Sequence, residues 1–268
     1  MADATRACPK CGAAVPAGFL FCGRCGAKTG TGGGAPAENL GQTQFFGQLQ
    51  AVGKAKLVLI KGEGMDGISY QLNATEHVAG RSQGVILFPD DRFLSSRHAN
   101  FFYREGKLCL RDEGSTNGVF LRIRQPVQVQ DGDLFLVGEE LLRFETIASP
   151  RPAELVAEDG TVFYGTPLRE GIGCRIVQVL LGGRMGMVYV PTKPQVLIGR
   201  EACDMNFPRD RFISGRHARL EQQGRSFLLS DMGSKNGTYL RQRQERELSH
   251  GDYVFIGQQL FRVEITAF

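Results

Sequence analysis

Short runs of apolar residues, several of them alternating with polar residues, recur along the chain from about residue 56. In the first part of this region the runs occupy 56–60, 68–72, 99–103, 108–111, 118–121, 133–137 and 142–146. Turns that contain Gly or Asp separate them, and no long run has the 3.6-residue period of an amphipathic helix. The pattern predicts an all-β fold in which two antiparallel sheets pack as a sandwich.

The whole pattern occurs twice, because the chain matches itself without gaps when it is shifted by 119 residues. The matched segments are Gly80-Arg81 with Gly199-Arg200, Ser95–Ala99 with Ser214–Ala218, Asp112–Gly118 with Asp231–Gly237, and Gly132-Asp133 with Gly251-Asp252. We therefore expect two β-sandwiches in tandem, at 54–147 and 173–268, each with an independent core. Residues 148–172 are expected to link them.

Four cysteines near the start of the chain form two CxxC pairs, Cys8 with Cys11 and Cys22 with Cys25. Each pair has the spacing at which one tight turn directs two thiolates at a single tetrahedral metal ion. Residues 6–28 contain too few apolar side chains for a core, so the pattern predicts a zinc ribbon with a structural zinc ion. A redox CxxC would be expected within a βαβ unit, which is missing here. Sequence leaves iron open as the bound metal.

Composition narrows the possible functions. Of 268 residues, 42% are hydrophobic and 22% charged, with a formal net charge of +4, which is typical of a globular chain and too mildly basic for bulk nucleic-acid binding. No apolar run approaches the roughly 18 residues of a membrane-spanning helix. The first residues lack the apolar core of a signal peptide. We expect a cytoplasmic protein, in which residues 29–53, rich in Gly, form a flexible linker.

The ordered motifs resemble the forkhead-associated (FHA) domain. They are Gly-Arg, then Ser-x-Arg-His, then Asp-x-Gly-Ser-x-Asn-Gly, then Gly-Asp before a closing pair of strands, and they occur in this order in both repeats. The resemblance implies a β-sandwich whose loops at one end bind phosphothreonine in a partner protein. It further implies a non-catalytic adaptor for Thr-phosphorylated proteins, with a Ser/Thr protein kinase upstream.

The resemblance assigns phosphothreonine contacts in each repeat. In the first repeat they are Arg81, Ser95, Ser96, Thr116 and Asn117; in the second they are Arg200, Ser214, Lys235 and Asn236. Arg suits the role because its planar guanidinium can engage phosphate oxygens in pairs. Gly215 replaces Ser96 in the second repeat and offers no side-chain contact. His98 and His217 are expected to fix the loops, and Gly118 and Gly237 to supply a positive φ.

Other functions remain to be weighed. Ser95 and His98 could be drawn as nucleophile and base, but no acidic third member is identifiable. Gly62-Glu-Gly64-Met-Asp-Gly67 fits a dinucleotide-binding motif, yet a strand pattern follows it where that site needs a helix. No enzyme is therefore expected. The alternatives that stay open are a phosphate-independent scaffold and nucleic-acid binding led by the zinc ribbon, with strong salt dependence as its mark.

A similar pentapeptide precedes each sandwich, Thr43–Gly47 and Thr161–Gly165. Its aromatic residues are expected to pack on the sandwich, as a first strand or as a staple. The alternative is that a kinase phosphorylates Thr43 or Thr161 and that the modified segment docks into one of the two sites as an internal ligand.

Overall fold

The computed structural model describes residues 5–16, 21–29, 55–60, 67–147, 157–162, 164–165 and 173–266. The chain divides into two units, Met1–Ala51 and Val52–Phe268. Among the described residues, none lies in a helix that is long and apolar enough to cross a membrane. The predicted linker at 29–53 lies outside the described residues except for Thr29.

The first unit is built around two similar turns, one for each CxxC pair. Strands β1 (Thr5–Ala7) and β2 (Ala14–Pro16) pair antiparallel around the first turn. A bridge between Phe21 and Lys28 closes the second. In each turn the backbone of the first cysteine makes two hydrogen bonds. Cys8 N–H donates to Ala13 O at 2.8 Å and Cys8 O accepts from Gly12 N–H at 2.9 Å. Cys22 bonds Ala27 O and Gly26 N–H in the same way, both at 2.8 Å.

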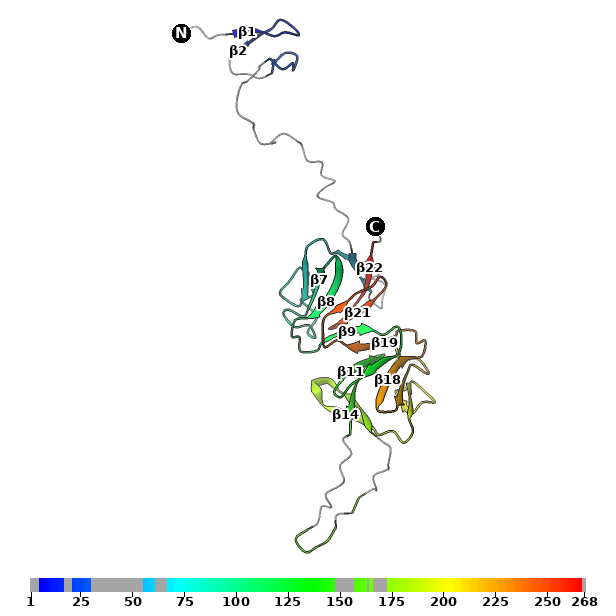
Figure 1. Ribbon diagram of the computed structural model, residues 1–268. Coiled ribbons are helices and arrows are strands. Elements are labelled where there is room, and N and C mark those ends of the chain that lie inside the picture. The colour runs from blue at the N-terminus through cyan, green and yellow to red at the C-terminus, as the bar shows by residue number, and fades with distance from the viewer. Residues whose placement is uncertain are drawn as a thin grey trace. The chain divides into compact units, whose positions relative to one another are not determined.

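The second unit is almost entirely β-strand (Figure 1). The strands of the first repeat are β3 (Ala55–Ile60), β4 (Ser69–Gln71), β5 (Glu76–Gly80), β6 (Ile86–Leu87), β7 (Ala99–Arg104), β8 (Lys107–Asp112), β9 (Val119–Arg122), β10 (Val127–Val129), β11 (Leu134–Val137) and β12 (Glu140–Thr146). Those of the second are β13 (Cys174–Val179), β14 (Met185–Tyr189), β15 (Gln195–Gly199), β16 (Met205–Asn206), β17 (Ala218–Gln223), β18 (Ser226–Asp231), β19 (Thr238–Arg241), β20 (Arg246–Glu247), β21 (Tyr253–Ile256) and β22 (Gln259–Ile265). One 3₁₀ turn, η2 (Leu181–Gly183), precedes β14.

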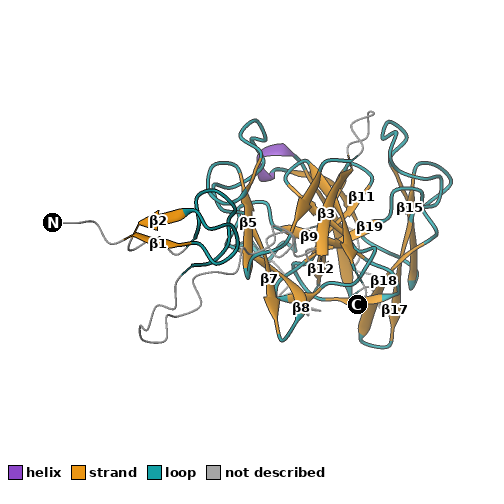
Figure 2. Ribbon diagram, turned by 90° about the horizontal axis from the view of Figure 1, so that it is seen from above, coloured by secondary structure: helices purple, strands orange, loops and turns teal. Residues whose placement is uncertain are grey.

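These strands form one ten-stranded sheet and two five-stranded sheets. The long sheet has the order β14-β13-β12-β11-β19-β9-β21-β22-β3-β4, and the short sheets have the orders β20-β8-β7-β5-β6 and β10-β18-β17-β15-β16. Each short sheet covers one half of the long sheet, which gives two sandwiches. Figure 2 shows β3, β9, β11 and β19 in the middle, with β5, β7 and β8 on one side and β15, β17 and β18 on the other. The predicted all-β class and the two sandwiches are confirmed.

The two repeats meet at an approximate two-fold axis in the long sheet. Strands β9 and β19 are equivalent in sequence, and they pair antiparallel with Leu121 opposite Leu240. These two leucines are themselves equivalent under the shift of 119 residues. The order of the sheet on either side of this pair is symmetric, so β21 follows β9 where β11 follows β19.

Each sandwich is closed by strands of the other repeat. In the first repeat, β9 pairs with β21, and β22 pairs with β3 along its whole length, from Leu260–Ile60 to Ile265–Ala55. Conversely, β11 pairs with β19 and β12 with β13. Figure 1 shows the orange and red strands β21 and β22 beside β7, β8 and β9 of the first repeat. The two repeats have therefore exchanged their last three strands.

The exchange changes the expected domain boundaries. The first core combines residues 55–119 with Leu248, Val254, Ile256, Phe261 and Val263, and the second combines Val129, Phe135, Val137, Leu142 and Phe144 with residues 174–229. The expected independent cores at 54–147 and 173–268 are therefore not what the structure contains. The chain crosses between sandwiches after β9 and after β19, whereas the two ends of the expected linker at 148–172 lie together, with Ile147 N–H bound to Gly173 O at 2.9 Å.

Substitution of one closing strand tests the exchange. Phe261 is fully buried and meets Phe101 edge to face, with ring centroids 6.3 Å apart. We expect Phe261→Ala to cost about 3–5 kcal/mol of stability and Leu142→Ala, its sequence-equivalent control, about 2–5 kcal/mol. In hydrogen exchange, Phe261→Ala should loosen β3 and β7 of the first repeat, and Leu142→Ala should loosen β13 and β17 of the second. Loosening confined to the repeat that carries the substitution would contradict the exchange.

Candidate functional site

Three loops of the first repeat meet at one end of their sandwich. Arg81 follows β5, Ser95 lies between β6 and β7, and the turn from Ser115 to Gly118 follows β8. Arg81 N–H donates to Ser95 O at 2.9 Å, and Thr116 N–H donates to Ser95 Oγ at 3.1 Å. Asn117 Nδ2 donates to Phe93 O at 2.7 Å, which joins the turn to the loop before Ser95. The structure thus brings together four of the five residues assigned in this repeat, and the fifth, Ser96, is the exposed neighbour of Ser95.

A buried histidine connects the same loops from below. The His98 ring is fully buried; its Nδ1 accepts from Ser95 N–H and its Nε2 donates to Gly118 O, both at 3.0 Å. A backbone N–H can only donate and a carbonyl can only accept, so these bonds require the neutral ring with its proton on Nε2. The ring therefore holds the backbone of Ser95 and makes no bond to its hydroxyl. This geometry matches a loop-fixing role and not a nucleophile–base pair.

Two glycines allow the loops to approach so closely. A Cβ on Gly80, the residue before Arg81, would lie 2.2 Å from Ser96 O, which no side chain could tolerate. Gly118 has a φ of 88° and its equivalent Gly237 a φ of 85°, the positive values that the sequence predicted. The Gly-Arg and Asn-Gly motifs are thus required by backbone packing.

The second repeat builds the same arrangement. Arg200 N–H donates to Ser214 O at 3.0 Å, Lys235 N–H to Ser214 Oγ at 3.2 Å, and Asn236 Nδ2 to Phe212 O at 2.7 Å. His217, also fully buried, accepts from Ser214 N–H and donates to Gly237 O, both at 3.0 Å. All four residues assigned in this repeat lie on these connected loops.

The bonding leaves suitable groups available for an anion. The Oγ atoms of Ser95 and Ser214 each accept from a backbone N–H, so each hydroxyl proton is available to an incoming acceptor. The side chains of Arg81 and Arg200 are exposed on the adjoining loop. At the tip of the turn the first repeat has Thr116 and the second Lys235, both exposed. Each end thus offers a cation, a hydroxyl donor and a carboxamide on fixed backbone.

Two aspartates that the site assignment missed support these loops. Asp91 is buried; its Oδ1 accepts from Phe93 N–H at 2.9 Å and its Oδ2 accepts from Gln258 N–H at 2.7 Å. Asp210 does the same, with Phe212 N–H at 2.7 Å and Glu139 N–H at 2.7 Å. The sequence signal for them is a triplet that occurs in both repeats, Asp91-Arg92-Phe93 and Asp210-Arg211-Phe212. Its second partner could not be foreseen, because it belongs to the other repeat.

The four CxxC thiols form a compact cluster in the first unit. All four Sγ atoms lie within 4.8 Å of one another, with Cys8 and Cys25 at 3.6 Å and Cys11 and Cys22 at 3.7 Å. A tetrahedral ion with metal–sulfur distances of about 2.3 Å places its ligands about 3.8 Å apart. Backbone hydrogen bonds, first that from Lys10, lower the pKa of the Cys8 thiol, whereas the pKa of the neighbouring Cys25 thiol is raised. The cluster has the geometry to bind a metal ion.

The predicted phosphorylation sites differ in what the structure describes. Thr43 lies outside the described residues. Thr161 is exposed, in a turn where its N–H donates to Asp159 Oδ1 at 2.9 Å. Tyr164 is fully exposed, so this aromatic residue does not pack on the sandwich as the first-strand interpretation expected. Phosphorylation of Thr161 stays a prediction, which mass spectrometry after kinase treatment would check.

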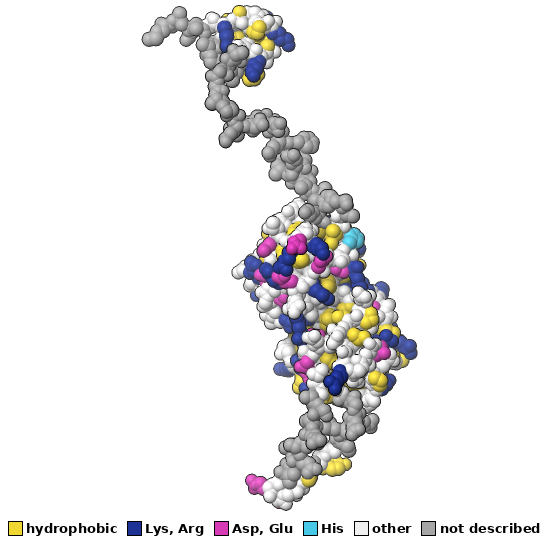
Figure 3. All heavy atoms as spheres, viewed as in Figure 1, with side chains coloured by type: hydrophobic (Ala, Val, Ile, Leu, Met, Phe, Trp, Pro, Cys, Tyr) yellow, Lys and Arg dark blue, Asp and Glu magenta, His cyan; other side chains and the backbone are white. Residues whose placement is uncertain are grey.

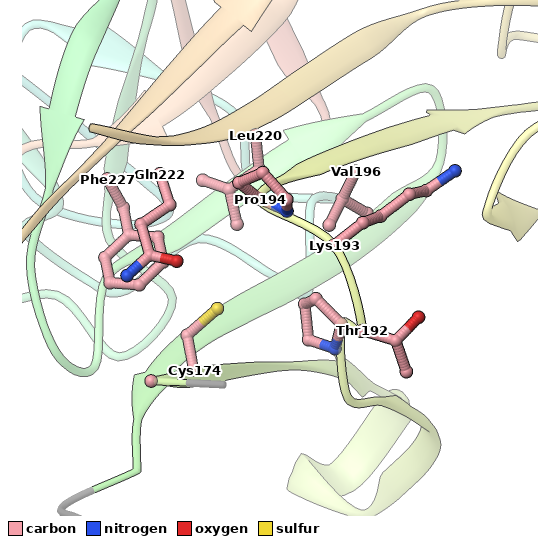
Figure 4. Close-up of a pocket in the computed structure, with 10 residues that line it drawn as sticks. Cys174, Thr192, Lys193, Pro194, Val196, Leu220, Gln222 and Phe227 are labelled. Carbon is pink, nitrogen blue, oxygen red and sulfur yellow. The ribbon is translucent and has the colours of Figure 1, made fainter. Parts of the chain in front are cut away.

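A cavity of 190 Å³ lies in the second sandwich, beside the start of β13. Cys174, Val196, Leu220 and Phe227 contribute to its wall, and Figure 4 shows the Lys193 side chain extending away from Cys174. Lys193 pairs with Asp204 at 2.8 Å. The cavity shares no residue with either set of loops, so we assign it no role in the site.

Comparison with known proteins decides the family. The model of the FHA domain matches residues 77–138 and 196–257. The "Oxoglutarate dehydrogenase inhibitor" of Corynebacterium diphtheriae is 33% identical over 96 residues, which are 35% of this chain and 67% of that protein. The chain belongs to the FHA-domain family. A second FHA relative, the "Glycogen accumulation regulator GarA" of Mycolicibacterium smegmatis, is 32% identical over 88 residues, 32% of this chain and 56% of that protein.

A solved FHA structure, described as "Structural and functional analysis of phosphothreonine-dependent FHA domain interactions", is also similar. It is 28% identical, covers 33% of this chain and 91% of that chain, and has a TM-score of 0.20. FHA domains bind phosphothreonine and act as non-catalytic adaptors in Ser/Thr kinase signalling. This chain accordingly carries two phosphothreonine-binding modules and is not an enzyme.

The buried histidines should make stability depend on pH. Burial lowers the pKa of both His98 and His217, and also that of His77. Below the unfolded value of about 6.5 the unfolded chain therefore binds more protons than the folded one. The free energy of unfolding should therefore keep its full value above about pH 6.5 and decline as the pH falls towards 5.

Denaturant unfolding at several pH values would measure this decline. The double variant His98→Gln, His217→Gln removes two of the titrating rings, so its unfolding free energy should depend less steeply on pH between 6.5 and 5. Carboxylates titrate mainly below this range, near pH 4. A slope equal to that of the wild type would show that these rings do not titrate as the structure requires.

Proposed function

We propose that each sandwich of the second unit binds one phosphothreonine peptide through the residues on its connected loops. The guanidinium groups of Arg81 and Arg200 bind the phosphate, and the hydroxyls of Ser95 and Ser214 donate to it. Asn117 and Asn236 hold the peptide backbone. Thr116 and Ser96 add neutral donors at the first site, and Lys235 adds a charge at the second. The observation that carries the proposal is the bond from the turn to the serine Oγ, since it leaves the hydroxyl proton free on a loop whose backbone is bonded to that of an exposed arginine.

The chemistry of phosphothreonine suits this arrangement. The group brings about −1.5 to −2 charges and three acceptor oxygens. Charge-assisted hydrogen bonds are worth about 1.5–3 kcal/mol each, so two or three of them, set against association costs of several kcal/mol, give at most moderate affinity. The binding is therefore reversible, as an adaptor requires. The partners of this protein are Thr-phosphorylated proteins, with a Ser/Thr kinase upstream. Reduced thiols at the metal cluster favour the cytoplasm as the compartment of the protein.

The first sandwich does not have the charge pattern of a nucleic-acid site. A nucleic-acid footprint is a patch or stripe of one charge sign. Over the first sandwich, Figure 3 instead shows basic and acidic side chains interspersed. Several of them are paired, as Arg104 with Glu245 at 2.7 Å and Arg111 with Glu113 at 2.9 Å.

Removal of the two arginines tests the proposal. We expect Arg81→Ala and Arg200→Ala each to weaken one phosphopeptide site about ten- to a hundred-fold, since each removes a charge-assisted contact. Calorimetric titration with a phosphothreonine peptide library measures both sites. Arg104→Ala and Arg225→Ala are matched controls, because they lie at the opposite end of the sandwiches, beside the β7–β8 and β17–β18 turns, and should leave affinity unchanged.

Two outcomes would contradict the assignment. Phosphopeptide binding that survives in the double variant Arg81→Ala, Arg200→Ala would show that the residues are wrong. Partner binding that survives both this variant and phosphatase treatment would favour a phosphate-independent scaffold. The apolar edge of the long sheet at β14 could serve such a contact. Leu181, just before this strand, is 81% exposed, and Met185, its first residue, is 63% exposed.

For the cysteine cluster we propose a structural zinc ion. Cys8, Cys11, Cys22 and Cys25 would be its ligands, as four thiolates are a common donor set for structural zinc. Without the ion, so few buried apolar residues (Val15 beside Cys8 and Cys22) would not hold this segment folded.

Metal analysis tests the zinc proposal. Purified protein should contain one zinc ion per chain by elemental mass spectrometry, and Cys8→Ser with Cys22→Ser should lose it. Cys203→Ser, which changes a thiol of the second sandwich, should retain it. Because the sandwiches have their own cores, the double serine variant should bind phosphopeptide with unchanged affinity. Iron in place of zinc, or full zinc content in the double variant, would refute the assignment.

A further inference from the structure

We propose that both phosphothreonine sites are composite, so that residues of each repeat help to select the peptide bound by the other. This inference rests on the proposed function of the two ends. Its basis is the hairpin that joins the last two strands of each repeat. Because these strands are exchanged, the β21–β22 hairpin lies at the first site and the β11–β12 hairpin at the second.

The first site shows the connection through Asp91. The hairpin residues Gln258 and Gln259, of the second repeat, donate to Asp91 Oδ2 at 2.7 and 2.9 Å. The other oxygen of Asp91 holds Phe93 N–H, and Phe93 O accepts from Asn117. A continuous path of hydrogen bonds therefore joins the hairpin of one repeat to the proposed peptide-holding carboxamide of the other.

The second site has the same path but a different charge. Glu139 N–H donates to Asp210 Oδ2 at 2.7 Å, Asp210 Oδ1 holds Phe212 N–H, and Phe212 O accepts from Asn236. Glu139 and Glu140 occupy the positions of Gln258 and Gln259. Glu140 is half-buried and bonded to Gln178 at 2.6 Å, whereas the Glu139 side chain is exposed. The first repeat thus places an exposed acidic side chain on the hairpin that contacts the loop before Ser214, where the first site has the neutral Gln258.

Close contact also crosses between repeats at the recognition turns. A Cβ on Gly118 would lie 2.2 Å from Arg241 Nε, and a Cβ on Gly237 would lie 2.2 Å from Arg122 Nε. Each turn therefore packs against an arginine of the opposite repeat. The hairpin contact and the turn contact involve different residues, and in both of them the opposite repeat supplies the group that meets the site.

The consequence is a crossed rule of specificity. A basic peptide side chain near the hairpin is attracted by Glu139 of the first repeat at the second site, whereas at the first site the hairpin carries the neutral Gln258 and the exposed acidic neighbour, Asp90, belongs to the first repeat itself. Arg209 and Arg211 of the second repeat lie on the loop that carries Asp210. Glu139 is therefore the exposed acidic group there that favours basic over acidic peptides. Residue 139 should therefore influence the second site although it belongs to the first repeat.

Charge exchange in the full chain tests this rule. Arg81→Ala isolates the second site and Arg200→Ala the first. In the Arg81→Ala background, Glu139→Gln should weaken phosphothreonine peptides that carry Lys or Arg beside the phosphothreonine by about two- to five-fold, the range of an exposed ion pair, and strengthen their Glu counterparts. In the Arg200→Ala background the same substitution should change nothing, whereas Gln258→Glu should strengthen the basic peptides at the first site.

Each result has one meaning. If Glu139→Gln alters the first site, the sites are built within single repeats and the inference fails. If it alters neither site while Arg81→Ala and Arg200→Ala each abolish one class of binding, the hairpin does not reach the peptide, and the inference fails although the proposed function stands. If neither arginine matters, the proposed function itself fails. Both substituted side chains are exposed, so folding is not at risk.

Discussion

The antiparallel pairing of β9 with β19 determines how the two repeats share their cores. With Leu121 opposite Leu240, the strands after this pair continue into the opposite sandwich. Val254, Ile256 and Phe261 then fill the first core, and Phe135 and Phe144 fill the second. Since burial of such side chains is the main favourable term in folding, neither repeat completes a core from its own residues in this arrangement. Both recognition ends depend on that pairing.

Below each recognition end, buried polar groups hold the loops with a fixed set of bonds. His98 bonds Ser95 and Gly118, and Asp91 bonds Phe93 and the crossed hairpin. A buried polar group that lost its partner would cost about 1–3 kcal/mol, so these bonds strongly favour one loop shape. The loops are thereby preorganised before any ligand arrives, which reduces the conformational entropy that binding must remove.

Much of this could be predicted from the sequence, and the exceptions share one cause. Short alternating runs predicted the strands, and the repeated Gly-Arg, Ser-x-Arg-His and Ser-x-Asn-Gly motifs predicted which loops meet. These are local properties or internal matches within one repeat. Strand exchange leaves every strand, turn and motif unchanged and alters only the partner across the sheet. The independent cores were therefore predicted wrongly, and the contacts of Asp91 with Gln258 and of Arg241 with Gly118 were missed.

The connection between repeats also takes a different meaning in the exchanged arrangement. Ile147 and Gly173, the residues that flank the expected linker, are hydrogen bonded and stand at the ends of the adjacent strands β12 and β13 of one sandwich. The true crossings are the short segments after β9 and β19, anchored by Ile123 N–H to Thr238 O at 2.9 Å and Gln242 N–H to Val119 O at 2.8 Å. A long insertion between paired strands costs little in loop entropy, whereas a change at either crossing acts on both sandwiches together. The connections between the two sandwiches are therefore these crossings, between β9 and β10 and between β19 and β20, and not the segment that joins the repeats in sequence.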